Sequence, residues 1–581
     1  MDNVLLCTQY NAAPQQMPER SARQFGFSRQ MRDNGNTYRY SNSSPPRVSL
    51  SNPLDVFGAL VDSGAWPVLR IGLHVTFFLA AFFILKQIFD FRALTELKHL
   101  GRSHRALLIP FAMIALLFAA VLVYQATWQL TGLFRPQFVS FMQTYDRRQF
   151  NPAHLIQRGR ILDRRGEVLA YSREYGEQVY RLYPYGPAFV HTVGYTHPKF
   201  GATGAEAAAN NHLNGATPEK LEAWGELGRQ LLTQGKRPRG QDLVLTLDTE
   251  LQLTAIQGLG SRRGAVVLLR PDDGAVLALA STPSYDPNRL TPALFRNSTA
   301  GAPLINRATQ GLYPPGSTFK VIVAALAIEA GFSGTLHCPA NGYTTSSHYR
   351  KIRDHEYYSA RRAGQAWKGF GNIRLDTALA KSSNVFFAQL GVQYGHDAFA
   401  RNAERFLFGR QIRLYPGTDR TGAINTGRIP QIADSDLYGL AQASIGQGRV
   451  SVSPAHMATV AAAVANQGVA MQPRLMAANP PVALARYMQE ETAQRLASMM
   501  RQVVTDGTGQ AINIDTLAIA GKTGTAENPH GKAHSWFIGF APAGHPALAV
   551  AVMVEQGGYG SLTAAPIARD LFLRAQDLGL L

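Results

Sequence analysis

Cysteine is scarce in this sequence, because only Cys7 and Cys338 occur among 581 residues. Two distant thiols cannot form the disulfide framework of a small secreted domain, so cysteine usage gives no information on the compartment. The sequence also lacks a run of Lys and Arg, zinc-finger spacing and an aromatic RNA-binding signature. These absences exclude the common classes of nucleic-acid-binding protein, and we expect no nucleic-acid partner.

Acidic residues are few relative to basic ones, with 39 Asp and Glu against 57 Lys and Arg and a formal net charge of +18. Such a chain favours anionic partners, and lipid headgroups or anionic wall polymers fit better than nucleic acid. A generally basic proteome would give the same excess. The hydrophobic share of 46% and charged share of 17% are ordinary for globular domains, and the length predicts two or three folded units.

One uncharged stretch, from Ala106 to Tyr124, is long enough to cross a bilayer, and it predicts a transmembrane helix over 106–130. Basic residues precede it at Lys98, Arg102 and Arg105. The positive-inside rule then places the rest of the chain outside the cytoplasm. The segment also starts too late for a cleaved signal peptide. We therefore expect a protein of the inner (plasma) membrane whose larger, C-terminal part is extracytoplasmic (periplasmic).

The segment 66–89 is a second apolar stretch, but charged or polar residues interrupt it at Arg70, His74 and Lys86. Two interpretations stay open, a membrane-spanning helix or an interfacial one. If this segment spans the membrane, the N-terminal tail lies outside, and otherwise the tail is cytoplasmic. Residues 1–50 are rich in Gln, Asn, Arg and Ser with little periodicity, and we expect a disordered tail over 1–65.

After the membrane segment, the pattern predicts a small strand-rich domain over 135–258. The run from Arg158 to Ala170 places turn residues between two apolar pairs, which is typical of a β-hairpin. A strand signal from Asp242 to Asp248 is followed by a helical pattern from Thr249 to Gly258.

The region 259–581 predicts an α/β (α+β) domain, in which an antiparallel sheet is flanked by helices. Strand signals lie at both of its ends: Gly264 to Leu269, Ala275 to Ala280, Ile519 to Thr525, Ser535 to Ala541 and Ala547 to Glu555. Helical patterns fill the middle and the end: Ser317 to Ala330, Leu375 to Tyr394, Pro454 to Ala465, Gln489 to Val504 and Pro566 to Asp577. The sheet must therefore join strands that are distant in the sequence.

The first chemical motif is YPPGSTFK, from Tyr313 to Lys320, which places a serine at the start of an apolar helix. Free backbone N–H groups and the positive end of the helix dipole suit a nucleophile whose product is an oxyanion. Lys320 lies three residues after Ser317, on the same helical face and among apolar neighbours. Such a desolvated lysine can lose its proton and act as a base. A Ser and a Lys at this spacing are also common on helix surfaces.

The second motif, KSSN from Lys381 to Asn384, interrupts an apolar helical pattern with polar residues. Buried polar residues need a reason. Ser382 is suited to shuttle a proton, and Asn384 to hold a substrate amide. A helix-end cap explains the same residues.

The third motif is KTGT, from Lys522 to Thr525, in a strand-like run. Gly524 permits the backbone of a ligand to approach the strand closely. Lys522 and the hydroxyls of Thr523 and Thr525 are suited to bind a carboxylate. Each motif alone is weak, but the three in this order form a specific signature.

These three motifs are those of penicillin-binding proteins and serine β-lactamases. The chain resembles a class B penicillin-binding protein, closest to the small elongation-type members. The similarity extends through nearly everything after residue 155, including RGRILDRRGEVLA, NRATQGLYPPGSTFK, ALAKSSNVFFAQLG, AGKTGTAE and HSWFIGFAP. It implies a peptidoglycan D,D-transpeptidase that binds β-lactams and stem peptides and needs no cofactor.

The resemblance also implies a role for each motif residue. Ser317 would attack the penultimate D-alanine, Lys320 would activate it, and Ser382 would pass the proton to the leaving D-alanine. Asn384 would orient the peptide. The terminal carboxylate would be held by the residues of the third motif, Lys522, Thr523 and Thr525, and the N–H groups of Ser317 and Thr525 would form the oxyanion hole.

The region before Gly260 is too short for a glycosyltransferase domain. We therefore expect a partner, a polytopic glycosyltransferase of the shape, elongation, division and sporulation family. Two alternatives use the same motifs: a D,D-carboxypeptidase or β-lactamase-like hydrolase, and a non-enzymatic penicillin sensor. His530 and His534 do not predict a metal site, because Gly531 and the following strand argue against a shared helical face.

Overall fold

The structure is a computed structural model that describes residues 157–175, 178–215, 239–296, 301–415 and 422–581, with scattered helical positions between 76 and 124. The chain divides into two compact units, residues 1–144 and 145–581. Within the described part of the chain, no helix is long and apolar enough to span a membrane. Apart from those scattered positions, the predicted tail and the segments 66–89 and 106–130 lie outside the described residues.

The second unit begins with a small four-stranded sheet in the order β3-β2-β1-β6. Its strands are β1 (Ile161–Leu162), β2 (Val168–Tyr175), β3 (Gln178–Leu182) and β6 (Leu243–Val244). Strands β1 and β2 pair antiparallel, which confirms the predicted hairpin, whereas β1 and β6 are parallel. Short elements follow: η3 (Gly186–Ala188), β4 (Thr196–His197), β5 (Gly201–Ala202), α5 (Gly204–Ala208) and α6 (Asn210–Leu213).

An ion cluster in the interior joins these small elements. Arg158 Nε and Arg181 Nε contact the two carboxylate oxygens of Glu206 at 2.6 and 2.7 Å, and Glu206 is fully buried. Burial alone would raise the pKa of Glu206, but the two arginines together hold it below its ordinary value. The carboxylate therefore stays ionised inside the fold.

The main sheet has five strands in the order β15-β16-β17-β7-β8, and every neighbouring pair is antiparallel. Its strands are β7 (Gly264–Leu269), β8 (Val276–Thr282), β15 (Ala520–Ala526), β16 (His534–Ala541) and β17 (Leu548–Val554). The register pairs Val554 with Gly264 and Ala549 with Leu269. This pairing confirms the prediction that strands from the two ends of the domain close one sheet.

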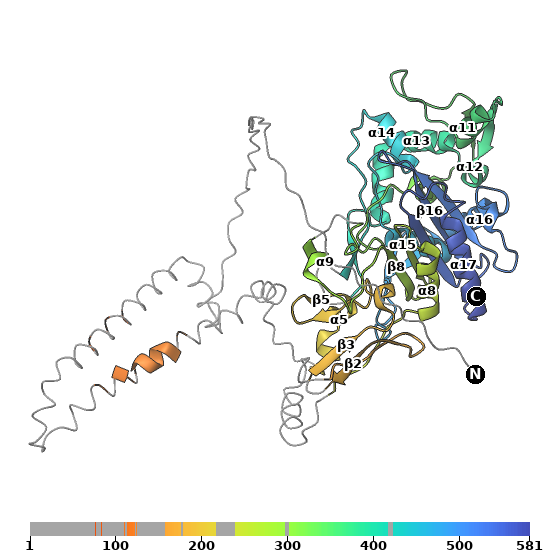
Figure 1. The fold of residues 1–581 in the computed structure, drawn as a ribbon. Coiled ribbons are helices and arrows are strands. Elements are labelled where there is room, and N and C mark those ends of the chain that lie inside the picture. The colour runs from red at the N-terminus through yellow and green to blue at the C-terminus, as the bar shows by residue number, and fades with distance from the viewer. Residues whose placement is uncertain are drawn as a thin grey trace, which may run out of the picture. The chain divides into compact units, whose positions relative to one another are not determined.

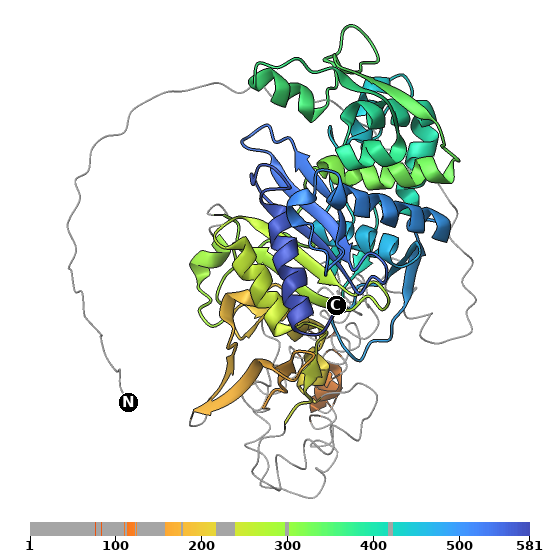
Figure 2. The ribbon, with the colours of Figure 1, turned by 90° about the vertical axis from the view of Figure 1, so that its right-hand side faces the viewer.

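Helices cover both faces of this sheet, and both faces are buried (Figures 1 and 2). Helices α8 (Thr249–Leu259) and α17 (Ala564–Asp577) pack on one face. The other face carries α15 (Pro454–Ala465), whose residues are buried almost throughout, together with α10 (Lys320–Glu329) and α16 (Glu490–Thr505). Because both faces are apolar, the strands are continuous hydrophobic runs rather than alternating ones.

The remaining elements lie in the sequence between strands β8 and β15. They are α9 (Pro292–Arg296), β9 (Thr335–Pro339), α11 (His355–Arg362), β10 (Gly369–Arg374), α12 (Leu375–Lys381), α13 (Asn384–Arg405), β11 (Gln411–Arg413), β12 (Ala423–Asn425), α14 (Leu437–Ser444), β13 (Val469–Met471), β14 (Ala483–Arg486) and η6 (Gln510–Ile512).

Two predicted helices differ from the structure. The helix predicted from Leu375 to Tyr394 is broken, because α12 ends at Lys381 and Ser382 adopts a left-handed conformation with φ 59° and ψ 36°. Ser383 then caps α13 by accepting a hydrogen bond from Phe386 N. The helix predicted from Ser317 begins with a 3-10 turn, η4 (Gly316–Phe319), before α10. Apolar periodicity continues across both changes and so conceals them.

Candidate active site

The turn that carries Ser317 lies directly against the edge strand β15. Gly316 has φ +52°, and a Cβ atom there would come within 2.7 Å of Thr525 O. Glycine therefore permits both the left-handed backbone and the close approach. The indole of Trp536, on the neighbouring strand β16, donates from Nε1 to Pro314 O at 2.9 Å. Ser317 itself is half-buried, while Lys320 is completely buried.

Gly524 provides the matching space on the strand. A Cβ atom at this position would lie 2.8 Å from Thr318 Cγ2 and 3.1 Å from Pro315 O. Any larger residue would push β15 away from the serine turn. The third motif is therefore in contact with the first, as the predicted shared site requires.

Lys320 is buried and makes its hydrogen bonds to the second motif. Its Nζ donates to Ser382 O at 2.6 Å, Asn384 Oδ1 at 2.7 Å and Ser382 Oγ at 3.4 Å. Burial lowers the pKa of Lys320 to about 7. Within the described residues, the expected contact with Ser317 Oγ is not among its hydrogen bonds, because the three donors of the ammonium already face the KSSN loop.

Lys522 approaches the same hydroxyl from the sheet. Its Nζ donates to Ser382 Oγ at 2.9 Å and to Thr523 O at 3.1 Å. Burial, and then the neighbouring charge of Lys320, lowers the pKa of Lys522 well below its ordinary value. A hydroxyl has two acceptor lone pairs and one donor. With both lone pairs directed at lysines, the Ser382 O–H is left to donate outward.

The KSSN segment combines the two interpretations that the sequence left open. Ser383 is the helix cap, and its neighbours on either side, Ser382 and Asn384, contact Lys320. Asn384 also donates from Nδ2 to Arg353 O at 2.9 Å. The break between α12 and α13 is what turns both side chains toward the lysine.

The two threonines of KTGT lie on the opposite side of β15 from Lys522, because successive strand residues alternate. Thr523 Oγ1 lies 2.6 Å from Thr508 Oγ1, and Thr525 Oγ1 accepts from Gly560 N at 3.4 Å. Both lie on β15, the edge strand of the main sheet. Thr508 was not predicted from the sequence, although the turn-forming run TDGTG that contains it precedes the strand.

A second group of residues, whose contacts were not predicted from the sequence, holds Tyr313 at the start of the serine motif. Tyr313 Oη donates to Glu555 Oε1 at 2.9 Å, and Arg307 Nε donates to the same oxygen at 2.8 Å. Burial and the nearby carboxylate raise the pKa of Tyr313 far above its ordinary value, so the phenol keeps its proton. The only sequence signal is a glutamate placed directly after an apolar strand.

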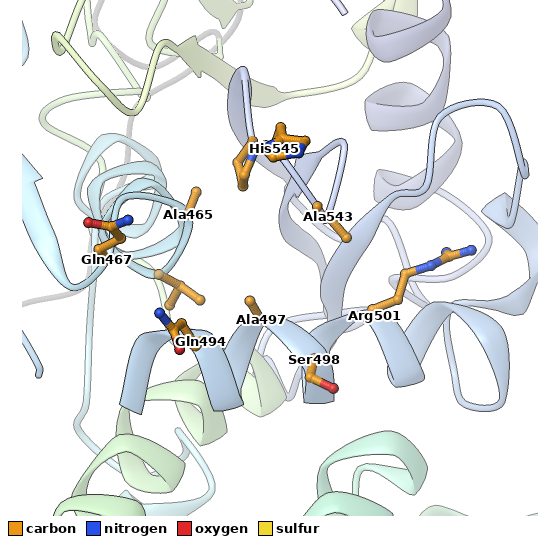
Figure 3. Close-up of a pocket in the computed structure, with 11 residues that line it drawn as sticks. Ala465, Gln467, Gln494, Ala497, Ser498, Arg501, Ala543 and His545 are labelled. Atoms are coloured by element: carbon orange, nitrogen blue, oxygen red, sulfur yellow. The ribbon is translucent and has the colours of Figure 1, made fainter. Parts of the chain in front are cut away.

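A hollow of about 720 Å³ lies elsewhere, between the end of α15, helix α16 and the loop after β16 (Figure 3). Its lining residues are Val464, Ala465, Gln467, Gln494, Ala497, Ser498, Arg501, Ala543, Gly544, His545 and Pro546. None of them belongs to the three motifs. Arg501 Nη1 already donates to Asn513 Oδ1 and Ile519 O, at 2.9 and 2.8 Å. We assign this hollow no part in the reaction.

Comparison with protein families gives two matches. The family described as the penicillin binding protein transpeptidase domain matches residues 264–573, and the penicillin binding protein A dimerisation domain matches residues 158–243. The first match covers all five strands of the main sheet, the three motifs and the helices α10, α15 and α16, together with most of α17. The fold and the site together therefore define a penicillin-binding-protein transpeptidase domain.

Individual relatives agree. The chain is 34% identical over 455 residues to peptidoglycan D,D-transpeptidase PbpA of Mycolicibacterium smegmatis, a match over 71% of this chain and 88% of that protein. It is 30% identical to peptidoglycan D,D-transpeptidase MrdA of Acinetobacter baumannii, over 68% of this chain and 66% of that protein. The chain belongs to the class B penicillin-binding proteins.

Solved structures show the same relationship. Penicillin-binding protein A from M. tuberculosis, in its penicillin G acyl-enzyme complex, superposes with a TM-score of 0.63 at 30% identity. The match covers 72% of this chain and 100% of that chain. The imipenem acyl-enzyme complex of the same protein gives a TM-score of 0.64 over 73% of this chain and 100% of that chain.

Proposed function

We propose that this chain is a serine-type peptidoglycan D,D-transpeptidase in which Ser317 is the acylated residue. The observation that carries the assignment of roles is the convergence of two buried lysines on one hydroxyl. Lys320 and Lys522 lie 3.4 and 2.9 Å from Ser382 Oγ, beside the turn that presents Ser317. Burial of Lys320 lowers its pKa to about 7, so a neutral amine is accessible near neutral pH.

In the acylation step, Ser317 Oγ attacks the carbonyl carbon of the penultimate D-alanine, and its proton moves to Lys320 Nζ. The backbone N–H groups of Ser317 and Thr525 stabilise the oxyanion. When the C–N bond breaks, Ser382 donates its proton to the leaving D-alanine amine and receives one from the lysines. A β-lactam follows the same course, except that its leaving amine stays tethered in the opened ring.

Substrate binding falls to the second and third motifs. Asn384 orients the peptide amide, and Gly524 admits the peptide backbone to the edge of β15. Lys522, Thr523 and Thr525 bind the terminal carboxylate. The position of these three residues supports this role, because all lie on the edge strand β15, whose Lys522 contacts Ser382 Oγ.

The second half-reaction transfers the acyl group from Ser317 to the amine of a neighbouring stem peptide, which forms the cross-link and restores the hydroxyl. A D,D-carboxypeptidase or β-lactamase would admit water instead. Slow release of bound penicillin would support the transpeptidase, whereas rapid turnover of penicillin would favour the hydrolase.

We place the reaction on the outer side of the plasma membrane, with the small domain over 135–258 and the transpeptidase domain over 259–581. The uncharged stretch from Ala106 to Tyr124 and the basic residues before it support this topology. Strand polymerisation is assigned to a polytopic glycosyltransferase partner of the shape, elongation, division and sporulation family. Co-purification in mild detergent tests the partner, and protease digestion of intact spheroplasts tests the topology.

The chemistry is tested by labelling membranes that contain the full chain with a fluorescent penicillin. Native protein and the control Ser498→Ala, whose serine is exposed on α16, are expected to be labelled equally. Ser317→Ala is expected to show no label. Labelling of the Ser317→Ala protein at the native level would overturn the assignment of the nucleophile.

A further inference from the structure

Asp354 is a buried carboxylate that the reaction described above does not use. It is 2% exposed and stands at the N-cap position of α11. An aspartate there usually accepts hydrogen bonds from the first turn of its own helix, but the side chain of Asp354 makes no such bond. Its Oδ1 instead accepts from Ser383 Oγ at 2.9 Å and from Val385 N at 3.1 Å. The carboxylate is therefore directed at the loop between α12 and α13.

The backbone beside Asp354 contacts the same loop. Arg353 O accepts from Asn384 Nδ2, and the other end of that amide, Asn384 Oδ1, accepts from Lys320 Nζ. Fixing the donor end of the amide leaves its oxygen facing the lysine. An unbroken set of hydrogen bonds thus runs from residues 353–354 through the KSSN loop to Lys320.

Burial raises the pKa of Asp354, and the hydrogen bonds from Val385 N and Ser383 Oγ, followed by the charge of Lys320, act in the opposite direction and favour the carboxylate. Its second oxygen, Oδ2, is buried without a hydrogen-bond partner in the described part of the chain. The charged groups that interact with Lys320 are the carboxylates of Asp354 and Glu356 and the ammonium of Lys522. Burial lowers the pKa of Lys320, and Asp354 followed by Glu356 acts in the opposite direction.

Two neighbours of Asp354 do not supply a competing charge. The thiol of Cys338 lies 3.8 Å from Ser383 Oγ, and burial raises its pKa to about 11, so it is neutral where the enzyme works. The hydroxyl of Ser383 is itself a donor to the carboxylate. Two carboxylates interact with Lys320, those of Asp354 and Glu356. Asp354 is the buried one of the two, since Glu356 is half-buried.

We propose that Asp354 is a positioning residue for the acylation of Ser317: its carboxylate holds the KSSN loop in place and sets a negative charge beside Lys320. This inference rests on the proposed function, because it requires Lys320 to be the base. When the serine proton arrives at Nζ, an ammonium forms in a buried site. A fixed negative charge stabilises that ammonium and so makes Lys320 a stronger base than burial alone would leave it.

The test is the pH dependence of acylation by penicillin in the purified full chain. Asp354→Asn keeps an acceptor oxygen for Ser383 and Val385 but removes the charge. In the native chain the acylation rate should rise with pH to a plateau, and this rise is the acid limb of the profile. Without the negative charge the pKa of Lys320 falls further, so the acid limb of Asp354→Asn is expected to move to lower pH by about one pH unit. Its plateau rate is expected to be several-fold lower, because a weaker base accepts the serine proton less readily. The matched control is Asp376→Asn, which removes a partly exposed carboxylate at the start of α12 and is expected to leave the profile unchanged.

Asp354→Glu keeps the charge but disturbs the hydrogen bonds, so its plateau should fall while its acid limb stays at the native pH. This variant decides the question if Asp354→Asn does not fold, as checked by thermal unfolding. The inference is overturned if the acid limb of the acylation profile stays at the native pH in Asp354→Asn, or if it moves in Asp354→Glu. A native profile with no acid limb would instead refute the proposed role of Lys320, so the two failures are distinguishable.

Discussion

Two regions of this protein bury positive charge in opposite ways. In the small domain, Arg158 and Arg181 enclose the carboxylate of Glu206 at 2.6 and 2.7 Å. In the active site, Lys320 and Lys522 are just as deeply buried, yet the partners of their Nζ atoms are hydroxyl, carbonyl and amide oxygens. One set of cations is neutralised by an anion in direct contact, and the other is not.

The difference shows how burial can serve stability or chemistry. An arginine keeps its proton in any folded protein, so a buried arginine needs a counter-ion. A lysine without a carboxylate in direct contact can instead release its proton, and burial lowers the pKa of Lys320 to about 7. The residue type and the partner together decide whether a buried cation is structural or reactive.

Replacing the reactive lysine of the active site with an arginine is expected to have the largest effect, and this effect is on the rate of acylation. Lys320→Arg keeps the positive charge but cannot yield a neutral base, so acylation by penicillin should slow by about a thousand-fold. The control is Lys381→Arg in the same motif, where the exposed lysine donates to Asp506 O. Rates are measured by stopped-flow labelling, and a native rate in Lys320→Arg would refute the general base.

Removing the anion from the structural cluster should be the next largest effect. Glu206→Gln leaves two buried arginines without a counter-ion and should lower the free energy of unfolding by about 3–5 kcal/mol. Denaturant unfolding measures the loss, and the folded fraction should still be acylated. Asp242→Asn, at the partly exposed pair with Arg160, is the control and should lose much less.

The pH dependence of this effect has a definite sign. The folded-state pKa of Glu206 lies below its unfolded value, so its stabilisation is present above the unfolded pKa and is lost as pH falls through the folded one. The free energies of unfolding of native protein and Glu206→Gln, plotted against pH, should therefore converge in acid. Parallel curves down to about pH 2 would contradict the assignment of an ionised Glu206.

The reactive lysine should show a smaller effect of the same sign, in a window at higher pH. Because burial lowers the pKa of Lys320, the unfolded chain binds one more proton than the fold between the folded and unfolded pKa values. Stability therefore rises with pH across that window. Lys320→Met should remove up to a few kcal/mol (~1.4 per pH unit) of that rise, and equal pH slopes in both proteins would contradict the prediction.

The sequence predicts the reactive region better than its surroundings. The three motifs and the apolar strands are local patterns, and both the five-stranded sheet and the contact between the first and third motifs follow from them. The break at Ser382 is hidden because apolar residues continue on both sides of it. Asp354 and Glu206 could not be assigned from the sequence, since their partners lie 29 and 48 residues away and only folding brings them together.

The central claim, that Lys320 is a base of lowered pKa for Ser317, is tested most directly by the rate of penicillin acylation of the native chain as a function of pH. The rate should rise through a single limb near the lysine pKa of about 7 and then level. Mass spectrometry of the trapped product should place the penicilloyl group on Ser317. A rate that is flat from about pH 5 to about pH 9, or that rises only near the ordinary lysine pKa of about 10, would contradict the account.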